Sequence, residues 1–167
     1  MRQTGLLSLA VLAVAACAPK PAEPPAAAAI ATVDQAAVKT AMDSIRARYM
    51  RLQAAGDAAG IAGLFTPDGG IDFFEAPPMR GRAAIEAGLK AGFGMRKPTS
   101  LEIVATATNA VNPSTAAELG TYHEMDSVKG KTYHAWGRWV TSGVRDSTGA
   151  WRLGYLMAFP DSTRQDK

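Results

Sequence analysis

The sequence contains little of what usually marks a metal, redox or nucleic-acid-binding protein. Its 167 residues include one cysteine and two histidines, so neither an internal disulfide nor a zinc-binding cluster is expected. A net charge of +3 is too small to indicate a nucleic-acid partner. Hydrophobic residues make up 47% and charged residues 20%, which is typical of a globular chain of about one domain. We therefore predict no metal, no cofactor and no nucleic acid.

The N-terminal hydrophobic run is too short to be a transmembrane helix. It spans residues 6–16, whereas a helix that crosses a bilayer needs about 20 residues. It follows Arg2 and has the length of the apolar region of a secretory signal peptide. It ends in Val14-Ala15-Ala16-Cys17, which resembles the lipobox of bacterial lipoproteins. The resemblance implies that residues 1–16 are removed and that Cys17 is lipidated; the alternative is an ordinary signal peptide in which Cys17 has no role.

An alanine- and proline-rich segment follows the signal peptide. Eleven of the fourteen residues 18–31 are Ala or Pro, which favours an extended, stiff spacer. We interpret residues 17–32 as the lipidated cysteine and a tether, 33–160 as the folded domain and 161–167 as a C-terminal tail. The acyl chains would make the membrane a stable partner. By resemblance to other lipoproteins, the absence of an acidic residue after the cysteine indicates the outer membrane of the cell envelope, in a host that has one.

The folded part begins with helical patterns. Apolar residues recur every three or four positions from Val38 to Leu52, which predicts a long amphipathic helix. Asp57 is suited to cap a second, short helix, and a third helix is predicted over 82–93. The proline and glycines of residues 66–70 predict a turn between the second and third helices.

Strand patterns dominate the second half of the chain. A short strand at 71–75 precedes the third helix, and alternating or β-branched runs predict four later strands, at 101–108, 115–125, 132–144 and 150–159. Helices first and strands afterwards favour an α+β fold, in which helices pack on one face of an antiparallel sheet.

Several short motifs follow one another in an order typical of one family. They are Tyr49, Ala55-Gly56-Asp57, Leu64-Phe65-Thr66-Pro67-Asp68, Arg80-Gly81-Arg82-Ala83-Ala84-Ile85, Glu118-Leu119-Gly120-Thr121-Tyr122 and Gly149-Ala150-Trp151-Arg152. Over about residues 33–160 the chain resembles a SnoaL-like domain of the nuclear transport factor 2-like superfamily, in a bacterial branch without assigned function. The resemblance implies a cone-shaped, cystatin-like fold, in which a curved antiparallel or mixed sheet wraps three N-terminal helices around an apolar cavity.

The resemblance leaves three functions open. Members of the superfamily are enzymes, such as ketosteroid isomerases and polyketide cyclases, or binders of ligands or proteins. We expect a lipid-anchored envelope protein that binds a small apolar ligand; the alternatives are an isomerase- or cyclase-like enzyme, and a module that dimerises or docks a partner through its sheet. The residues predicted to line the pocket are Tyr49, Phe65, Ile71, Phe73, Leu119, Trp136, Trp151 and Tyr155.

Tyr49 is the first candidate for a catalytic role. In ketosteroid isomerases a tyrosine at the matching place donates a hydrogen bond to the developing oxyanion; the alternative is that Tyr49 is a core aromatic residue. The place of the family's catalytic aspartate falls on Phe73, which cannot accept a proton. Asp72 and Glu75 are the remaining candidates for a base, and strand alternation places Glu75, but not Asp72, on the same face as Phe73.

The two histidines form the remaining candidate site. His123 and His134 fall on neighbouring predicted strands and would face each other across a hairpin centred near Val128-Lys129. A metal site needs at least a third ligand, and alternation sends Glu124 to the opposite face, while Asp126 falls in the predicted turn. We interpret the histidines as a solvated or locally bonded pair.

Overall fold

The computed structural model describes residues 32–74 and 76–167. In this part the chain forms helices α1 (Gln35–Ala54), α2 (Ala58–Ala62) and α3 (Gly81–Met95). Its strands are β1 (Phe65–Phe73), β2 (Met79–Arg80), β3 (Lys97–Asn112), β4 (Thr115–Val128), β5 (Lys131–Arg145) and β6 (Trp151–Gln165). The predicted signal peptide, Cys17, the tether up to residue 31 and Glu75 lie outside the described residues. Among the residues described, no helix is long and apolar enough to cross a membrane.

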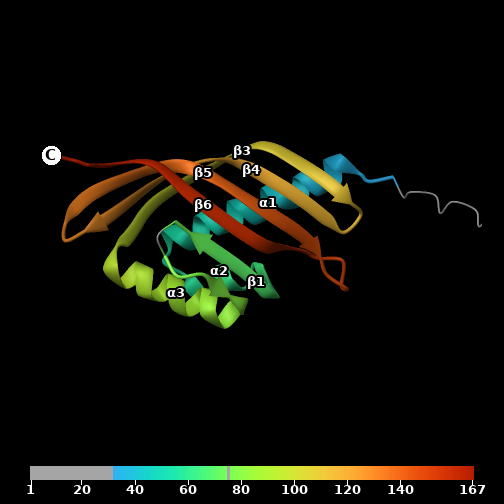
Figure 1. Cartoon of the computed structure of the whole chain (residues 1–167), viewed down its shortest axis with the longest axis horizontal. Helices are drawn as coiled ribbons and strands as arrows, with labels where there is room; N and C mark the ends of the chain where they lie inside the picture. Colours follow the sequence, from blue (N-terminus) through green and yellow to red (C-terminus); the bar gives the residue numbers. More distant parts are fainter. Residues whose placement is uncertain (1–31, 75) are drawn as a thin grey trace, which may run out of the picture. The chain divides into compact units, whose positions relative to one another are not determined.

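All six described strands belong to one curved, mixed sheet. Their order is β2-β1-β6-β5-β4-β3. Strand β1 pairs parallel to β6, and every other neighbouring pair is antiparallel. Helix α1 runs along one face of the long strands, and α3 lies beside β1 (Figure 1). This arrangement confirms the predicted α+β class, with N-terminal helices against a curved sheet.

Helix α1 is held by its cap and by its apolar stripe. The carboxylate of Asp34 accepts a hydrogen bond from the backbone N–H of Ala37 (2.9 Å), which satisfies one of the free donors of the first turn. The stripe predicted from the sequence is buried against the sheet and the other helices; its buried apolar members are Val38, Met42, Ile45 and Tyr49. The same residue type caps α2, where Asp57 accepts from the N–H of Gly60.

Two predicted boundaries are wrong. Residues 66–70 do not form a turn between elements but belong to β1, where the register with β6 jumps between Phe65 and Gly70. Their turn-forming chemistry produces a bulge inside the strand. The segment 161–167 is not a tail through most of its length, because β6 continues to Gln165 and pairs with β5 as far as Tyr133. The long β5 strand needs hydrogen-bond partners for its backbone there, and β6 supplies them.

The sheet has two faces that are used differently. The face toward the helices, here called the inner face, carries every second residue of β4, including Glu118, Tyr122 and Glu124, and the opposite, outer face carries the alternate residues, such as Leu119 and His123. Strand β6 changes its alternation at two bulges, near Gly154 and Asp161, where the register with β5 shifts. These bulges decide which of its large side chains face the helices.

Two glycines on the inner face let the sheet curve. A Cβ at Gly120 would collide with the backbone of Val104 and Ala105 on β3. A Cβ at Gly137 would collide with the carbonyl of Phe159 on β6 and with the ring of Tyr122. Both positions therefore require the smallest residue, because neighbouring strands or rings occupy the space of a side chain.

Candidate functional site

A cavity of about 920 Å³ lies between the inner face of the sheet and helices α1 and α3. This volume falls within the range of about 300–1,000 Å³ that is typical of small-molecule sites. Its walls are mainly apolar and come from all parts of the fold; they include Phe73, Leu101, Ile103, Trp139, Leu156 and Ala158. Polar side chains enter the cavity at only a few places, so their positions define what it can bind.

One polar group in the cavity contains the candidate catalytic residue Tyr49. Its other members are Gln53 and Glu124. Tyr49 and Gln53 lie one turn apart on α1, and both line the cavity. The Nε2 of Gln53 donates a hydrogen bond to Oε1 of Glu124 at 2.7 Å. The hydroxyl of Tyr49 has no hydrogen-bond partner in the part of the chain that the structure describes. Glu124 is near enough to act on it electrostatically.

Burial controls the protonation of these groups. Burial, reinforced by the charge of Asp126, raises the pKa of Glu124 to about 7, although the hydrogen bond from Gln53 and the charge of Arg96 act in the opposite direction. Burial and then the charge of Glu124 raise the pKa of the Tyr49 hydroxyl above its ordinary value. At neutral pH Tyr49 is therefore a neutral donor, while the pKa of Glu124 lies near the ambient pH.

A second carboxylate lies next along β4. Asp126 is buried, and its Oδ2 accepts a hydrogen bond from Arg96 at 3.2 Å. Burial raises the pKa of Asp126, and the charge of Arg96 opposes that effect. The prediction that Asp126 lies in the hairpin turn is wrong, because β4 continues through Val128 and the turn falls at Lys129–Gly130.

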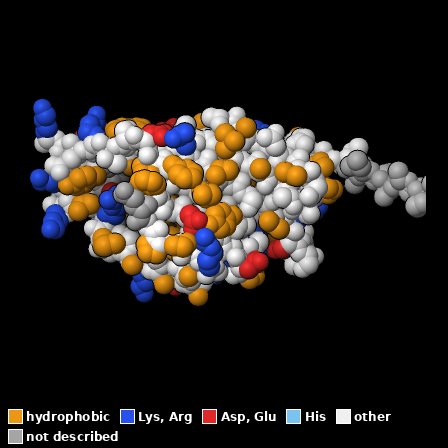
Figure 2. Space-filling model, viewed as in Figure 1, with side chains coloured by type: hydrophobic (Ala, Val, Ile, Leu, Met, Phe, Trp, Pro, Cys, Tyr) orange, Lys and Arg blue, Asp and Glu red, His pale blue; other side chains and the backbone are white. Residues whose placement is uncertain are grey.

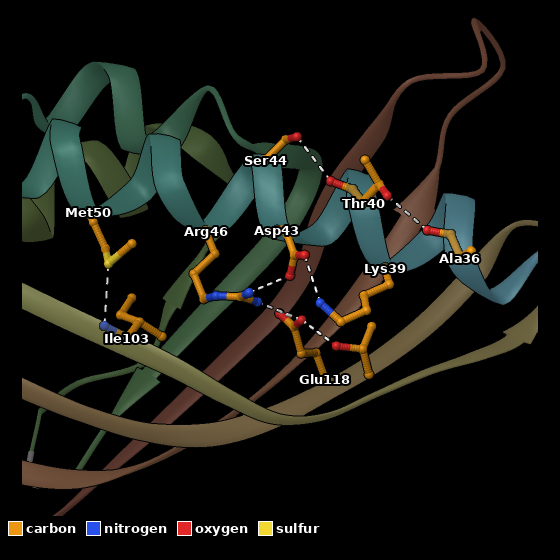
Figure 3. A network of polar contacts seen from close by, with 10 residues as sticks. Ala36, Lys39, Thr40, Asp43, Ser44, Arg46, Met50, Ile103 and Glu118 are labelled. Atoms are coloured by element: carbon orange, nitrogen blue, oxygen red, sulfur yellow. Dashed lines mark hydrogen bonds and ion pairs between the residues drawn. The ribbon is translucent and has the colours of Figure 1, made fainter.

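A buried ion pair between α1 and β4 also lines the cavity, one turn of α1 before Tyr49 (Figure 3). Nη1 of Arg46 lies 2.6 Å from Oε1 of Glu118, whose side chain is only 2% exposed. Thr108 donates a further hydrogen bond to the same oxygen, and Asp43 pairs with Arg46 from the preceding turn of α1. Because each of these charges has a partner of opposite sign, this ion pair holds the helix to the sheet.

The structure separates the predicted pocket residues into three groups. Tyr49 and Phe73 line the cavity, whereas Phe65 and Ile71 are fully buried in the core and Trp151 packs against that core. The prediction that the remaining three line the pocket is wrong, because they lie on the outer face: Leu119, Trp136 and Tyr155. For Tyr155 the reason is the bulge at Gly154, which turns it to the face opposite Leu153.

Asp72 is not placed to act as a base in the cavity. It pairs with Met157 of β6 on the outer face, where its Oδ1 lies 2.6 Å from Nη1 of Arg80 and its carboxylate accepts a hydrogen bond from Tyr155. These bonds lower the pKa of Asp72. The prediction of Asp72 as a catalytic base is therefore wrong for this cavity, and the prediction of Glu75 falls on a residue that the structure does not describe.

Sequence reasoning missed Gln53 and Glu124 as site residues. Gln53 continues the buried stripe of α1 one turn beyond Tyr49. Glu124 is two residues beyond Tyr122 on the inner face of β4, so the same alternation that excluded it from the histidine pair places it in the cavity. The missing information was which face of β4 looks toward α1.

The two histidines meet on the outer face. They pair diagonally, because His123 lies opposite Trp136 and His134 opposite Met125. Nε2 of His123 is 3.0 Å from Nδ1 of His134, and Nε2 of His134 is 3.2 Å from Oδ2 of Asp166. Both rings lie nearly parallel to the Trp136 ring. No cluster of three or more potential metal ligands occurs within residues 32–74 and 76–167.

Comparison with known proteins identifies the domain. A family model described as SnoaL-like domain matches residues 34–156. The chain belongs to the SnoaL-like family. This confirms the resemblance found in the sequence. No curated protein sequence matches this chain.

Solved structures share the nuclear transport factor 2-like, cystatin-like fold of this SnoaL-like domain. A ketosteroid isomerase-like protein from Erwinia carotovora atroseptica is 12% identical over 74% of this chain and 95% of its own, with a TM-score of 0.68. A type 2 hexachlorocyclohexane dehydrochlorinase is 11% identical over 80% and 92%, with a TM-score of 0.69. A nuclear transport factor 2-like protein from Novosphingobium aromaticivorans is 20% identical over 74% and 81%, with a TM-score of 0.59. At these identities the likeness shows the fold alone.

Proposed function

We propose that this SnoaL-like domain binds a small, mostly apolar molecule whose polar group reaches Tyr49 and Glu124. The observation that carries the proposal is the cavity of about 920 Å³, whose mainly apolar walls contain a compact group of buried polar side chains, Tyr49, Gln53 and Glu124. A largely apolar pocket with a few convergent polar groups is the usual form of a small-molecule site.

Binding of a fluorescent apolar probe, N-phenyl-1-naphthylamine, tests this proposal. The full chain would carry Cys17→Ser, so that no acyl chain competes for the cavity. Ala158 lines the cavity, and Ala158→Trp should weaken probe binding about tenfold or more because the indole fills the space. Ala117 is exposed, and Ala117→Trp is the matched control that should leave binding unchanged. Equal binding by all three chains would refute a site in this cavity.

Proton transfer is a second candidate function, favoured by the protonation of Glu124. A carboxylate whose pKa lies near the working pH is suited to accept and return a proton, and Tyr49, which lines the same cavity, would donate a hydrogen bond to an oxyanion. Under this proposal Glu124 takes the role that sequence analysis gave to Asp72 or Glu75.

Isomerisation of a β,γ-unsaturated ketone tests the enzymatic proposal. We expect Glu124→Gln to lower the rate by roughly 10²–10⁴-fold, since a positioned general base contributes about that much. The rate of the unsubstituted chain should rise as the pH passes about 7, where Glu124 loses its proton. Tyr49→Phe should also slow the reaction. If the rate is unchanged in Glu124→Gln, a role of Glu124 in proton transfer is refuted.

We also propose that Cys17 anchors the domain to a membrane of the cell envelope. The lipobox-like Val14-Ala15-Ala16-Cys17 and the Ala/Pro-rich segment after it support this anchor. In a detergent phase-partition experiment on cells that express the full chain, the protein should enter the detergent phase, and Cys17→Ser should move it to the aqueous phase or leave it unprocessed. Equal partition of both chains would contradict lipidation.

A further inference from the structure

The geometry points to a ligand whose polar group is a hydroxyl, selected by Gln53 as acceptor and Tyr49 as donor. This inference rests on the proposed binding function and specifies the chemistry of the ligand at that site.

Gln53 has a buried acceptor without a partner. Its side chain lines the cavity, and the residue is only 8% exposed. Nε2 is engaged by Glu124 at 2.7 Å, so the amide oxygen is turned away from that carboxylate. This Oε1 atom is buried and accepts no hydrogen bond from any described residue. Buried polar atoms of native proteins nearly always have a partner, so an unpaired acceptor in a cavity wall suggests that a ligand supplies the donor.

Tyr49 provides the complementary group one helical turn earlier. Side chains four residues apart lie on the same face of a helix, and both Tyr49 and Gln53 line the cavity. The Tyr49 hydroxyl is protonated at physiological pH, because the ordinary pKa of tyrosine is 10.0 and burial raises the pKa of Tyr49 further. It can therefore donate to a ligand oxygen that lies between the two side chains.

Only some polar groups satisfy both residues. A ketone or ether oxygen can accept from Tyr49 but leaves Oε1 of Gln53 unpaired. An alkylammonium can donate to Gln53 but has no lone pair for Tyr49. A hydroxyl carries one donor and two acceptor sites, so an alcohol, enol or phenol on an apolar frame pairs with both.

Three probes that differ only in this group test the inference. Naphthalene, 2-naphthol and 2-methoxynaphthalene are titrated by calorimetry into the full chain with Cys17→Ser. At pH 8, above the pKa of about 7, Glu124 is ionised and holds Nε2 of Gln53. We expect 2-naphthol to bind about tenfold more tightly than its methyl ether, since a buried acceptor penalises a ligand that cannot donate to it.

Two substitutions separate the contributions of the acceptor and the donor. Gln53→Met keeps a side chain of similar length without the acceptor, and it should reduce the preference for 2-naphthol over the ether to about twofold or less. Tyr49→Phe should weaken naphthol and ether alike and leave their ratio unchanged, because both accept from Tyr49. Circular dichroism of each variant shows whether it remains folded. Should a variant fail to fold, the ratio of the affinities for 2-naphthol and its methyl ether in the chain with native Gln53 and Tyr49 still tests the inference.

The outcomes distinguish this inference from the binding proposal. If naphthalene, 2-naphthol and the ether bind equally to the chain with native Gln53 and Tyr49, the cavity binds apolar molecules but the hydroxyl preference is refuted. A preference that survives Gln53→Met refutes the role of Gln53. If none of the three probes binds, the proposed binding function itself fails.

Discussion

The inner and outer faces of the sheet carry carboxylates of the same kind in opposite electrostatic states. On the inner face, burial raises the pKa of Glu124 to about 7 and also raises that of Asp126. On the outer face, Asp72 has the Arg80 guanidinium and the Tyr155 hydroxyl as partners, and its pKa is lowered. Because successive residues of one strand point to opposite faces, a shift of one residue along a strand moves a side chain from one environment to the other.

The comparison teaches that burial and hydrogen-bond partners, not residue type, decide which carboxyl group can hold a proton near neutral pH. Glu124 has an amide as its hydrogen-bond partner, and an amide compensates burial only in part. Asp72 has a cation and lies where water reaches it. A group left protonatable near neutral pH inside a cavity is a candidate for function, whereas a paired surface carboxylate serves the fold.

The apolar residues of the two faces also differ in their exposure to solvent. Those of the inner face are covered by the helices or line the cavity. The outer face leaves large apolar side chains exposed (Figure 2), among them Val104, Leu119, Val140 and Phe159. An exposed apolar patch of this kind often marks an interface. The sequence-based alternative of dimerisation through the sheet stays a prediction that concerns this face.

Removal of Arg46 should have the largest effect on stability. Arg46→Met leaves the buried charge of Glu118 without its cation, and we expect a loss of about 3–5 kcal/mol in the free energy of unfolding. On the outer face, Arg138 forms an exposed pair with Asp161, so Arg138→Met should produce no resolved change. Chemical denaturation of both variants checks the contrast. Equal losses of unfolding free energy would show that the buried Arg46–Glu118 pair contributes no more than the exposed Arg138–Asp161 pair.

The pH dependence of stability should have opposite signs on the two faces. The folded state holds the proton of Glu124 more tightly than the unfolded state, so the stability from this group is complete below about pH 4.5 and is lost as the pH rises to about 7. The stability difference between the unsubstituted chain and Glu124→Gln should therefore fall by about 3 kcal/mol across that range.

Asp72→Asn is the matched control for this experiment. Because the folded pKa of Asp72 is lowered, its stabilising contribution is present above its ordinary value of 3.8 and is lost as the pH falls below that value. Denaturation at a series of pH values measures both variants. If both differences change with pH in the same direction, the contrast between the faces is wrong.

The hydroxyl of Thr141 should make a smaller contribution. This buried residue of the inner face donates to the carbonyl of Tyr155 at 2.6 Å, and Thr141→Val should cost about 1 kcal/mol of unfolding free energy. Thr106 makes a similar bond to the carbonyl of Leu119, but it is exposed. Thr106→Val should cost less, since water replaces the lost partner. Thermal unfolding compares the two; a larger cost at Thr106 would reverse the expected order.

The smallest effect on folding is expected at Leu119. Its side chain is 48% exposed on the outer face, so Leu119→Asp should leave the unfolding midpoint nearly unchanged. If a second copy of the chain covers this face, the substitution should weaken self-association about tenfold in sedimentation equilibrium. Dimers that persist unchanged in Leu119→Asp, or a chain that is monomeric throughout, would contradict dimerisation through the sheet.

Local patterns were sufficient for the helices and for the order of the elements, but not for all strand boundaries or for the site. The stripe that contains Tyr49, the cap at Asp57 and the order of helices before strands could be predicted because each depends on near neighbours in sequence. Tyr155 could not be placed, because a bulge at Gly154 changes the alternation of β6. Glu124 was assigned correctly to the face opposite His123, yet nothing local indicated that this face encloses a cavity.

The sequence by itself determined the family, the fold class and the helix that presents Tyr49, since periodicity, capping and ordered motifs are written in adjacent residues. Only the tertiary structure decided that Gln53 and Glu124 share a buried hydrogen bond and that Asp72 is paired on the outside. Burial and partner choice depend on strands and helices that are distant in sequence, and those two factors set the protonation and availability of each polar group.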